Sequence, residues 1–119
     1  MTELHPEDAK LVTLARATRS RTGASEGAAV RDETGRTYTA ASVFLDSLRL
    51  SAVQVAVATA ASSGARQLMA AAVVRSDLRQ RTGAGIADGD LSALRDLGGT
   101  GITVYLCDAT GAVLATPTA

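Results

Sequence analysis

Residues 47–63 carry apolar side chains on almost every side of a helix, with Arg49 and Gln54 as the main polar exceptions. A helix that is apolar all round must be buried. Asp46 or Ser47 offers a side chain that can accept a backbone N–H and so cap its first turn. Since the chain has only 119 residues, complete burial of this helix suggests that another subunit covers part of it.

Glycine and proline divide the rest of the chain into short elements. Pro6 fits the first turn of a helix, and Gly23 fits its end. The turn DETG at 32–35 recurs as DATG at 108–111, and its glycine, Gly35 in the first copy, supplies the positive φ of a tight hairpin turn. The expected elements, in chain order, are a helix over 6–22, strands over 26–31 and 36–43, the helix over 47–63, a strand over 68–74, a helix over 90–97 and strands over 102–107 and 112–115.

This order predicts one α/β domain over residues 1–119, with a mixed five-stranded sheet and the element order α-β-β-α-β-α-β-β. A strand, a buried helix and a second strand imply a parallel crossover, which should be right-handed. Asp90 fits the N-cap of the helix that follows a polar, glycine-rich segment. We expect that segment, 76–89, to be a mobile loop, and residues 1–5 and 116–119 to fray.

Charge and composition argue against several classes of function. Twelve basic residues balance twelve acidic ones, so there is no strong signal for nucleic-acid binding, which needs a basic excess. Cys107 and His5 are the only cysteine and histidine, which excludes a disulfide framework and a zinc site with several Cys or His ligands from one chain. We interpret Cys107 as a small buried apolar residue and His5 as a solvated tail residue. The pattern contains neither a signal peptide nor a transmembrane span, so we expect a cytoplasmic protein with no membrane partner.

Four short strings carry a resemblance to a known family. GAAV at 27–30 is followed by a hairpin, LRLSAVQVA stands at 48–56, and LRDLGG at 94–99 precedes VYL at 104–106. In this order and spacing they resemble the small cytidine deaminases of nucleoside salvage, whose Gly-Ala-Ala strand, buried zinc helix LTLCAERVA, last catalytic helix and following strand they match. The resemblance spans about residues 11–115. It implies a three-layer α-β-α fold, a zinc cofactor, and a homo-oligomer whose sites are completed across subunits.

The residues that the family uses for chemistry are replaced here. By position, Ser51 stands where the family has its first zinc-binding cysteine, and Val53 where it has the proton-shuttling glutamate. The family's PCGxC motif falls on IADGD at 86–90, which puts Ala87 and Asp90 at the other two cysteine positions. A serine hydroxyl is a poor zinc ligand at neutral pH, alanine is none, and valine cannot move a proton. We therefore expect no bound zinc, no other cofactor and no catalytic residues.

The substrate pocket that the resemblance implies is altered as well. The Asn-Val-Glu string that binds ribose in the family corresponds to Ser42, Val43 and Phe44 here. Phe44 cannot accept a ribose hydroxyl as a carboxylate does, so Ser42 and Phe44 are remnants of that pocket. Ser51 is then either a hydrogen-bonded core serine, which we favour, or part of a site for an anion or small ligand.

Together these observations predict a non-catalytic cytidine deaminase-like protein that acts as a homo-oligomeric binding or assembly module, a dimer or a tetramer. Three alternatives stay open. The first is a zinc-dependent deaminase that converts cytidine to uridine in pyrimidine salvage. The second is a metal-free sensor of a nucleoside or another small molecule. The third is a partner subunit of another deaminase or of an RNA-associated protein.

Overall fold

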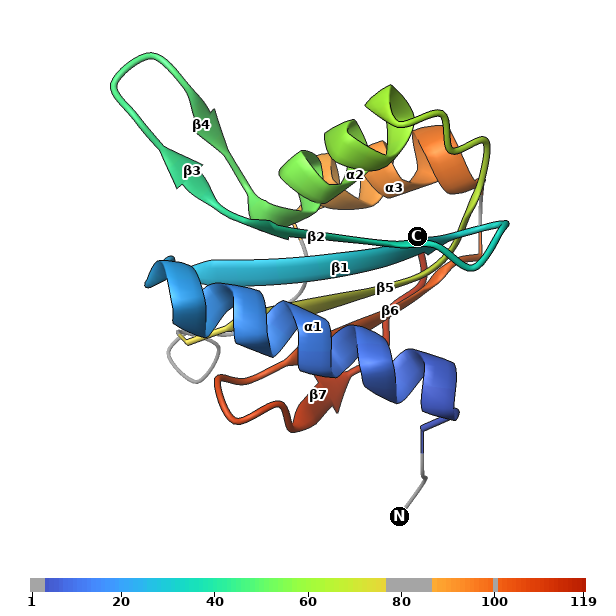
Figure 1. Cartoon of the computed structure of the whole chain (residues 1–119), viewed down its shortest axis with the longest axis horizontal. Coiled ribbons are helices and arrows are strands. Elements are labelled where there is room, and N and C mark those ends of the chain that lie inside the picture. Colours follow the sequence, from blue (N-terminus) through green and yellow to red (C-terminus); the bar gives the residue numbers. More distant parts are fainter. Residues whose placement is uncertain (1–3, 77–86, 100) are drawn as a thin grey trace.

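A mixed β-sheet lies between two helical layers (Figure 1). The computed structural model describes residues 4–76, 87–99 and 101–119. Strands β1, β2, β5, β6 and β7 form a five-stranded sheet in the order β2-β1-β5-β6-β7, and β3 and β4 form a separate two-stranded hairpin. The elements are α1 (Pro6–Thr22), β1 (Glu26–Asp32), β2 (Thr37–Ala41), β3 (Val43–Phe44), β4 (Arg49–Leu50), α2 (Ala52–Ser62), β5 (Leu68–Arg75), α3 (Asp88–Gly98), β6 (Thr103–Cys107) and β7 (Val113–Ala115). The predicted three-layer α/β architecture with a mixed five-stranded sheet is confirmed.

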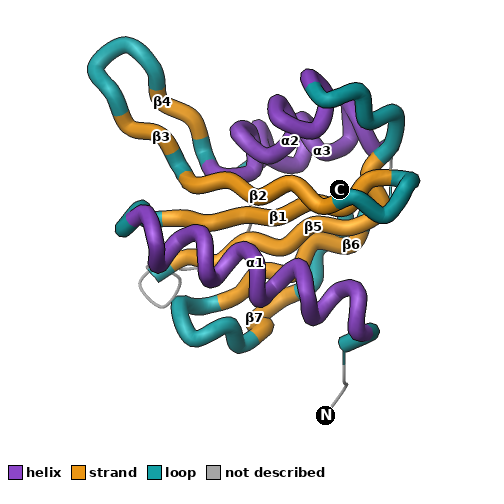
Figure 2. Tube along the Cα trace, in the orientation of Figure 1, coloured by secondary structure: helices purple, strands orange, loops and turns teal. Residues whose placement is uncertain are grey.

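Two crossover connections place α2 and α3 on the same face of the sheet. Strand β1 runs antiparallel to both β2 and β5, and β6 runs parallel to β5. Helix α2 therefore connects the parallel strands β2 and β5, which flank β1, and α3 connects the parallel neighbours β5 and β6. Figure 2 shows α2 and α3 together on one side of the sheet and α1 on the other. The predicted parallel crossover is present. No helix in the described part of the chain is long and apolar enough to cross a membrane.

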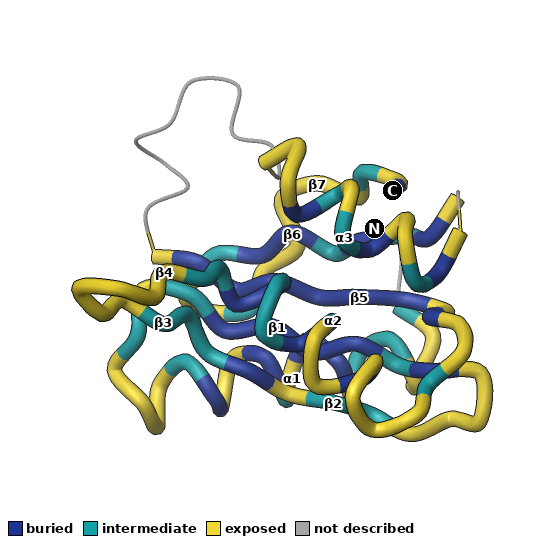
Figure 3. Tube along the Cα trace, turned by 90° about the horizontal axis from the view of Figure 1, so that it is seen from above, coloured by how far each residue is buried: buried dark blue, intermediate teal, exposed yellow. Residues whose placement is uncertain are grey.

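Alternating side chains along the central strands build a separate core on each face. On β1, Ala28 and Val30 pack with α2 and α3, whereas Ala29 packs with α1. Strand β6 repeats the pattern, with Leu106 on the first side and Cys107 on the second, because successive strand residues point to opposite faces. Figure 3 shows β1 and β5 buried along most of their length. Cys107 is buried, as predicted.

Helix α1 packs closely on β1 because Gly27 has no side chain where they meet. A Cβ on Gly27 would collide with the carbonyl oxygen of Ala15 and would lie 2.8 Å from the Cβ of Arg19. The helix begins after His5, whose Nδ1 accepts the backbone N–H of Glu7 at 3.2 Å. The predicted range of α1 is confirmed, and His5, which is exposed as predicted, also caps the helix.

The two hairpin turns share one hydrogen-bonding pattern, as their repeated sequence predicts. Asp32 Oδ1 accepts the backbone N–H and the hydroxyl of Thr34 at 2.9 and 2.7 Å, and a further backbone N–H two residues on. Asp108 makes the corresponding bonds to Thr110. The hydroxyl of Tyr38 also donates to Asp32, at 2.8 Å. Although desolvation by burial opposes ionisation, these hydrogen bonds lower the pKa of Asp32 to about 2.

Helix α2 begins later than the sequence pattern predicts. Ser51 is its N-cap: the Ser51 Oγ accepts the N–H of Gln54 at 3.0 Å, and the Gln54 side chain accepts the N–H of Ser51 at 2.9 Å. This capping box fixes the first turn of the helix. The two residues expected to cap it, Asp46 and Ser47, lie instead in the loop between β3 and β4.

Only one side of α2 is buried within the chain. Its buried residues are Ala52, Val53, Ala56 and Ala60. Ala58 and Ala61 are exposed, and Val55 is half-buried. The expectation that the whole helix is buried is therefore wrong for a single chain. The exposed side of α2 mixes Ala58 and Ala61 with the polar Thr59 and Ser62, and Val55 packs partly against the core.

Helix α3 also begins at a different residue from the one predicted. It starts at Asp88, and the N-cap position is Ala87, which makes no side-chain capping bond. Asp90 is therefore not the N-cap but the third residue of the helix, in its first turn. The end of the predicted loop, 88–89, belongs to α3, and residues 77–86 of that loop lie outside the described part of the chain.

The C-terminal residues are bound to β6 and its surroundings. The N–H of Ala119 donates to the carbonyl of Ile102 at 2.9 Å, and the N–H of Val104 donates to the carbonyl of Pro117 at 2.8 Å. Ala119 is buried in the core on the α2 and α3 side. In the structure the backbone of these residues extends the pairing at this edge of β6, and the expectation that residues 116–119 fray stays a prediction.

Candidate functional site

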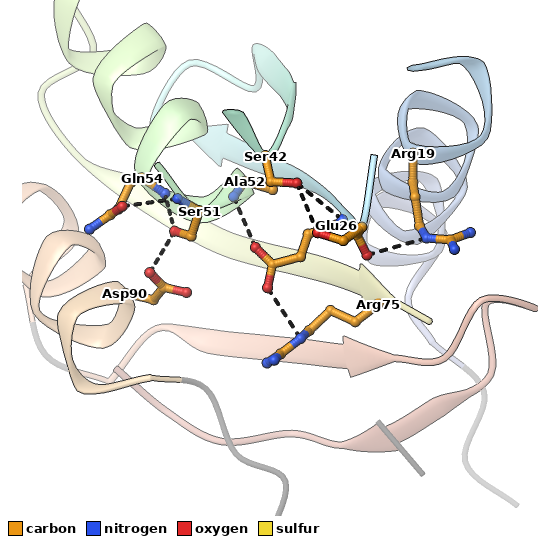
Figure 4. A network of polar contacts seen from close by, with 9 residues as sticks. Arg19, Glu26, Ser42, Ser51, Ala52, Gln54, Arg75 and Asp90 are labelled. Carbon is orange, nitrogen blue, oxygen red and sulfur yellow. Dashed lines mark hydrogen bonds and ion pairs between the residues drawn. The ribbon is translucent and has the colours of Figure 1, made fainter. Parts of the chain in front are cut away.

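The start of α2 and the start of α3 are joined by one short hydrogen bond (Figure 4). The hydroxyl of Ser51 donates to Asp90 Oδ1 at 2.6 Å. Ser51 is half-buried and Asp90 is 7% exposed. A hydrogen bond to a carboxylate in such a place is charge-assisted and stronger than a neutral one. The two positions that the resemblance placed in one site therefore do lie together, and Ser51 is hydrogen-bonded on both its donor and its acceptor side.

Glu26 brings a second carboxylate to the same end of α2. Its Oε1 accepts the N–H of Ala52 at 3.2 Å, a backbone donor in the first turn that has no partner inside the helix. A negative charge is stabilised there by the helix dipole. The Glu26 Oε2 lies 3.2 Å from Nε of Arg75, and the two side chains are 17% and 7% exposed. This ion pair is largely removed from water.

Ser42 joins the ends of β1 and β2 beside this network. Its N–H donates to the carbonyl of Glu26 at 3.1 Å, and its Oγ accepts the N–H of Glu26 at 3.3 Å. Phe44, the other predicted remnant of a pocket, lies on β3 and is 79% exposed. Its ring contacts the guanidinium of Arg49, which lies 4.4 Å from the ring centroid. Ser42 therefore serves the strand ends, and Phe44 lies on the surface of the β3–β4 hairpin.

The other two predicted positions bring no hydrogen-bonding side chain to the site. Val53 is 1% exposed and belongs to the core that α2 and α3 share with the sheet. Ala87 is exposed at the N-cap of α3. All four positions thus lie at the starts of α2 and α3, but only Ser51 and Asp90 are joined by a hydrogen bond.

The zinc that the resemblance implies does not fit these residues. The Ser51 hydroxyl proton is directed at Asp90, which leaves one carboxylate where a zinc site uses three or four good ligands. Cys107 lies on the opposite face of the sheet, and desolvation together with the charge of Asp108 raises the pKa of its thiol to about 11, so it is protonated at neutral pH. His5 caps α1. Within residues 4–76, 87–99 and 101–119, no three His, Cys, Asp or Glu side chains are grouped as a metal centre requires.

A second polar cluster fastens α1 to the sheet on the opposite face. Asp8 accepts a hydrogen bond from the hydroxyl of Tyr105 at 2.6 Å and one from Arg31 Nη1 at 2.9 Å. The hydrogen bond to Asp8, together with burial, raises the pKa of Tyr105 to about 12. Burial opposes ionisation of Asp8, but the bonds from Tyr105 and Arg31 still lower its pKa. Each group is matched to a partner, so the cluster is suited to holding α1 in place.

Sequence reasoning missed Glu26 and Arg75 as members of the network. They are opposite charges at the two ends of apolar strands, and they become cross-strand partners only in the observed register of β1 and β5. That register is a long-range property, since 49 positions separate the two residues in the chain. The role of Ser51 as an N-cap could have been predicted from the sequence, because Ser51 and Gln54 have the spacing of a capping box.

The fold and this network define an α/β domain of the cytidine deaminase fold, in which a polar hydrogen-bonded cluster lies where two helices begin. A family model described as cytidine deaminase-like matches residues 4–111. The chain therefore belongs to the cytidine deaminase-like family.

Solved structures agree with this assignment. The cytidine deaminase from Burkholderia pseudomallei superposes with a TM-score of 0.73 at 23% identity, over 100% of this chain and 92% of that chain. The enzyme from Mycobacterium leprae gives a TM-score of 0.69 at 20% identity, over 87% and 89% of the two chains. The enzyme from Mycobacterium tuberculosis gives 0.65 at 24% identity, over 80% of each. At such identities the likeness establishes the fold. Comparison with curated proteins gives no match.

Proposed function

We propose that this protein is a non-catalytic member of the cytidine deaminase-like family that acts as a homo-oligomeric binding or assembly module. One observation supports this above all others. The positions that the resemblance equates with two zinc ligands, Ser51 and Asp90, are hydrogen-bonded to each other at 2.6 Å. At the position of the proton-shuttling glutamate, Val53 is an apolar core residue.

The chemistry of the remaining groups agrees with this proposal. The hydrolysis of an exocyclic amine needs an activated water and a group that moves protons. The carboxylate of Glu26 is already engaged by the N–H of Ala52 and by Arg75. The polar groups at the start of α2 thus serve helix capping and cross-linking.

The test is a deaminase assay combined with metal analysis. Purified protein is incubated with cytidine in the presence of added zinc, uridine is measured by chromatography, and bound zinc is measured by elemental analysis. An active cytidine deaminase serves as the positive control. We expect no uridine above the protein-free blank and well under one zinc per chain. About one zinc per chain together with turnover of cytidine would establish the competing function of a zinc-dependent deaminase instead.

The proposal includes a dimer or tetramer in the cytoplasm without a bound cofactor. The exposed apolar side chains of Phe44, Leu45 and Leu48 between β2 and α2 support an oligomer, because exposed apolar surface marks interaction sites. Cys107 is a single buried cysteine whose thiol is protonated at neutral pH, so it forms no disulfide that would require an oxidising compartment. This supports the cytoplasmic location. Sedimentation of the purified protein and fractionation of cells test these two points separately.

A further inference from the structure

The positive charge of this chain is concentrated on α1. Residues 9–25 contain Lys10, Arg16, Arg19 and Arg21 and no aspartate or glutamate. The rest of the chain holds the other eight basic residues and all twelve acidic ones, so its net charge is −4. The chain is therefore neutral as a whole, but its charge is strongly polarised between α1 and the remainder.

Three of these cations lie on the side of α1 that faces away from the sheet. Lys10, Arg16 and Arg21 are exposed, and we call them the basic face. The opposite side of the helix is packed on the sheet through its buried residues Leu11, Val12, Ala15 and Thr18. Figure 2 shows α2 and α3 on the other side of the sheet, so in the described part of the chain no helix covers the basic face.

No carboxylate in residues 4–76, 87–99 and 101–119 is paired with the basic face. The ion pairs in this part of the chain are Arg31–Asp8 and Arg75–Glu26. Cations in the last turn of a helix are stabilised by the helix dipole, which accounts for Arg19 and Arg21. It does not account for Lys10 and Arg16, which lie before the last turn.

We propose that the basic face binds an acidic segment of a partner protein, a stretch of chain with several closely spaced aspartate or glutamate side chains. A guanidinium binds a carboxylate through two parallel hydrogen bonds. Lys10 and Arg21 are eleven residues apart, which is about 17 Å along the helix. An extended segment of about six residues has this length. The inference goes beyond the proposed function, because it holds whether or not the chain is catalytic or oligomeric.

The surroundings of the basic face favour a protein segment over a membrane or a nucleic acid. The exposed side of α1 also carries Thr13 and Ser20, and its apolar side faces the sheet, so no apolar surface is left to enter a bilayer. A nucleic acid longer than α1 would meet the net negative charge of the remaining chain. Aromatic residues make up only 3% of the sequence, which leaves few platforms on which bases could stack.

A titration followed by NMR tests this assignment, because the amide signals of a small protein report weak binding and its location together. The probe is hexaglutamate at low ionic strength, and a single-stranded oligothymidylate is titrated in parallel. The basic-face variant carries Lys10→Gln, Arg16→Gln and Arg21→Gln. The matched control carries Arg36→Gln, Arg66→Gln and Arg95→Gln, three exposed arginines outside α1, and has the same net charge.

Both variants should fold, because all six side chains are exposed and glutamine is tolerated in helices. Circular dichroism checks this. Arg16→Glu, a single exposed substitution by a good helix former, keeps the test valid if the triple variant on α1 fails to fold.

Hexaglutamate should shift the amide signals of residues 10–21 of the wild type and of the control most strongly. One exposed ion pair contributes about a factor of two to three to a binding constant, so the basic-face variant should bind about 10-fold more weakly. Arg16→Glu should also weaken binding. Raising the salt from about 20 to about 200 mM should weaken binding to the wild type, since these charges are exposed.

The inference is overturned if hexaglutamate leaves the wild-type spectrum unchanged or shifts mainly signals outside α1. An equal loss of affinity in the basic-face variant and the control would reduce the effect to net charge and would also overturn it. Tighter binding of oligothymidylate than of hexaglutamate, lost in the basic-face variant, would assign the face to nucleic acid instead. Turnover of cytidine, or a monomeric wild type, would overturn the proposed function and leave this inference intact.

Discussion

Replacing Ser51, the N-cap of α2, with alanine should destabilise the protein more than replacing Ser62, the serine within that helix. The hydroxyl of Ser51 accepts the N–H of Gln54 and donates to Asp90, so alanine removes both bonds. Loss of an N-cap costs about 1 kcal/mol. The carboxylate of Asp90, which is 7% exposed, also loses its hydroxyl donor, which adds about 1–2 kcal/mol. The expected loss in the free energy of unfolding is therefore about 2–3 kcal/mol, or a fall in Tm of about 10 °C.

Urea titrations followed by circular dichroism measure this loss. Ser62→Ala is the control, because Ser62 is exposed at the other end of α2 and, among the described residues, its hydroxyl bonds only to the carbonyl of Thr59. That variant should stay within about 0.5 kcal/mol of the wild type. A double-mutant cycle of Ser51→Ala with Asp90→Ala should give a coupling of about 1–2 kcal/mol. A Ser51→Ala protein as stable as the control, with no coupling to Asp90, would refute the assigned network.

Three further substitutions test other parts of the fold. Gly27→Ala should lower the free energy of unfolding by about 2–3 kcal/mol, because the added Cβ pushes α1 away from β1. Gly89→Ala is the control, since a Cβ there would lie 4.0 Å from the side chain of Gln54. In the same thermal unfolding experiment it should stay within about 1 kcal/mol of the wild type. Arg75→Met leaves the carboxylate of Glu26 without the Arg75 guanidinium and should lower the free energy of unfolding by about 3 kcal/mol. Adding Glu26→Gln to that variant should recover part of the loss in urea titrations. No recovery would argue against the ion pair. The pKa of Asp32 falls from 3.8 to about 2 on folding, so the stability it contributes is present above pH 3.8 and is lost as the pH falls towards 2. Asp32→Asn should therefore flatten the plot of unfolding free energy against pH in that range. An unchanged plot would contradict the hydrogen bonds assigned to Asp32.

The start of α2 shows why local pattern fixed the fold class better than the element boundaries. Leu48 and Leu50 satisfy a helical spacing together with the residues after Ser51, so the apolar pattern extends the predicted helix backwards. In the structure Leu48 lies in the loop between β3 and β4 and Leu50 lies on β4, and the capping box of Ser51 and Gln54 sets the boundary of the helix. Capping chemistry was the sharper signal here, because apolar periodicity does not distinguish a short strand from a helical turn. The helix at 6–22 was predicted correctly because Pro6 and Gly23 mark its ends independently of periodicity.

The candidate site was predictable only in part. The family resemblance placed Ser51 and Asp90 in one site, and the structure joins them by a hydrogen bond. The role of Asp90 was not predictable, because an aspartate near a helix start fits the N-cap and the first turn equally well. The pairing of Glu26 with Arg75 depends on the register of β1 against β5. Register follows from the packing of both faces of the sheet, which no local window of sequence contains.

The fold itself accounts for acidic side chains at the site without any metal. The hydrogen bond between Ser51 and Asp90 shows that α2 and α3 begin close to each other, so the positive ends of two helix dipoles meet there. Backbone N–H groups without helical partners add to that field, and one of them is bound by Glu26. Negatively charged or electron-pair-donating groups are therefore stabilised at this point whether or not the chain binds a metal ion. Two carboxylates and one hydroxyl lie there in this chain. The electrostatics of the helix ends thus accounts for Glu26 and Asp90, and their presence is not by itself a sign of a cation site.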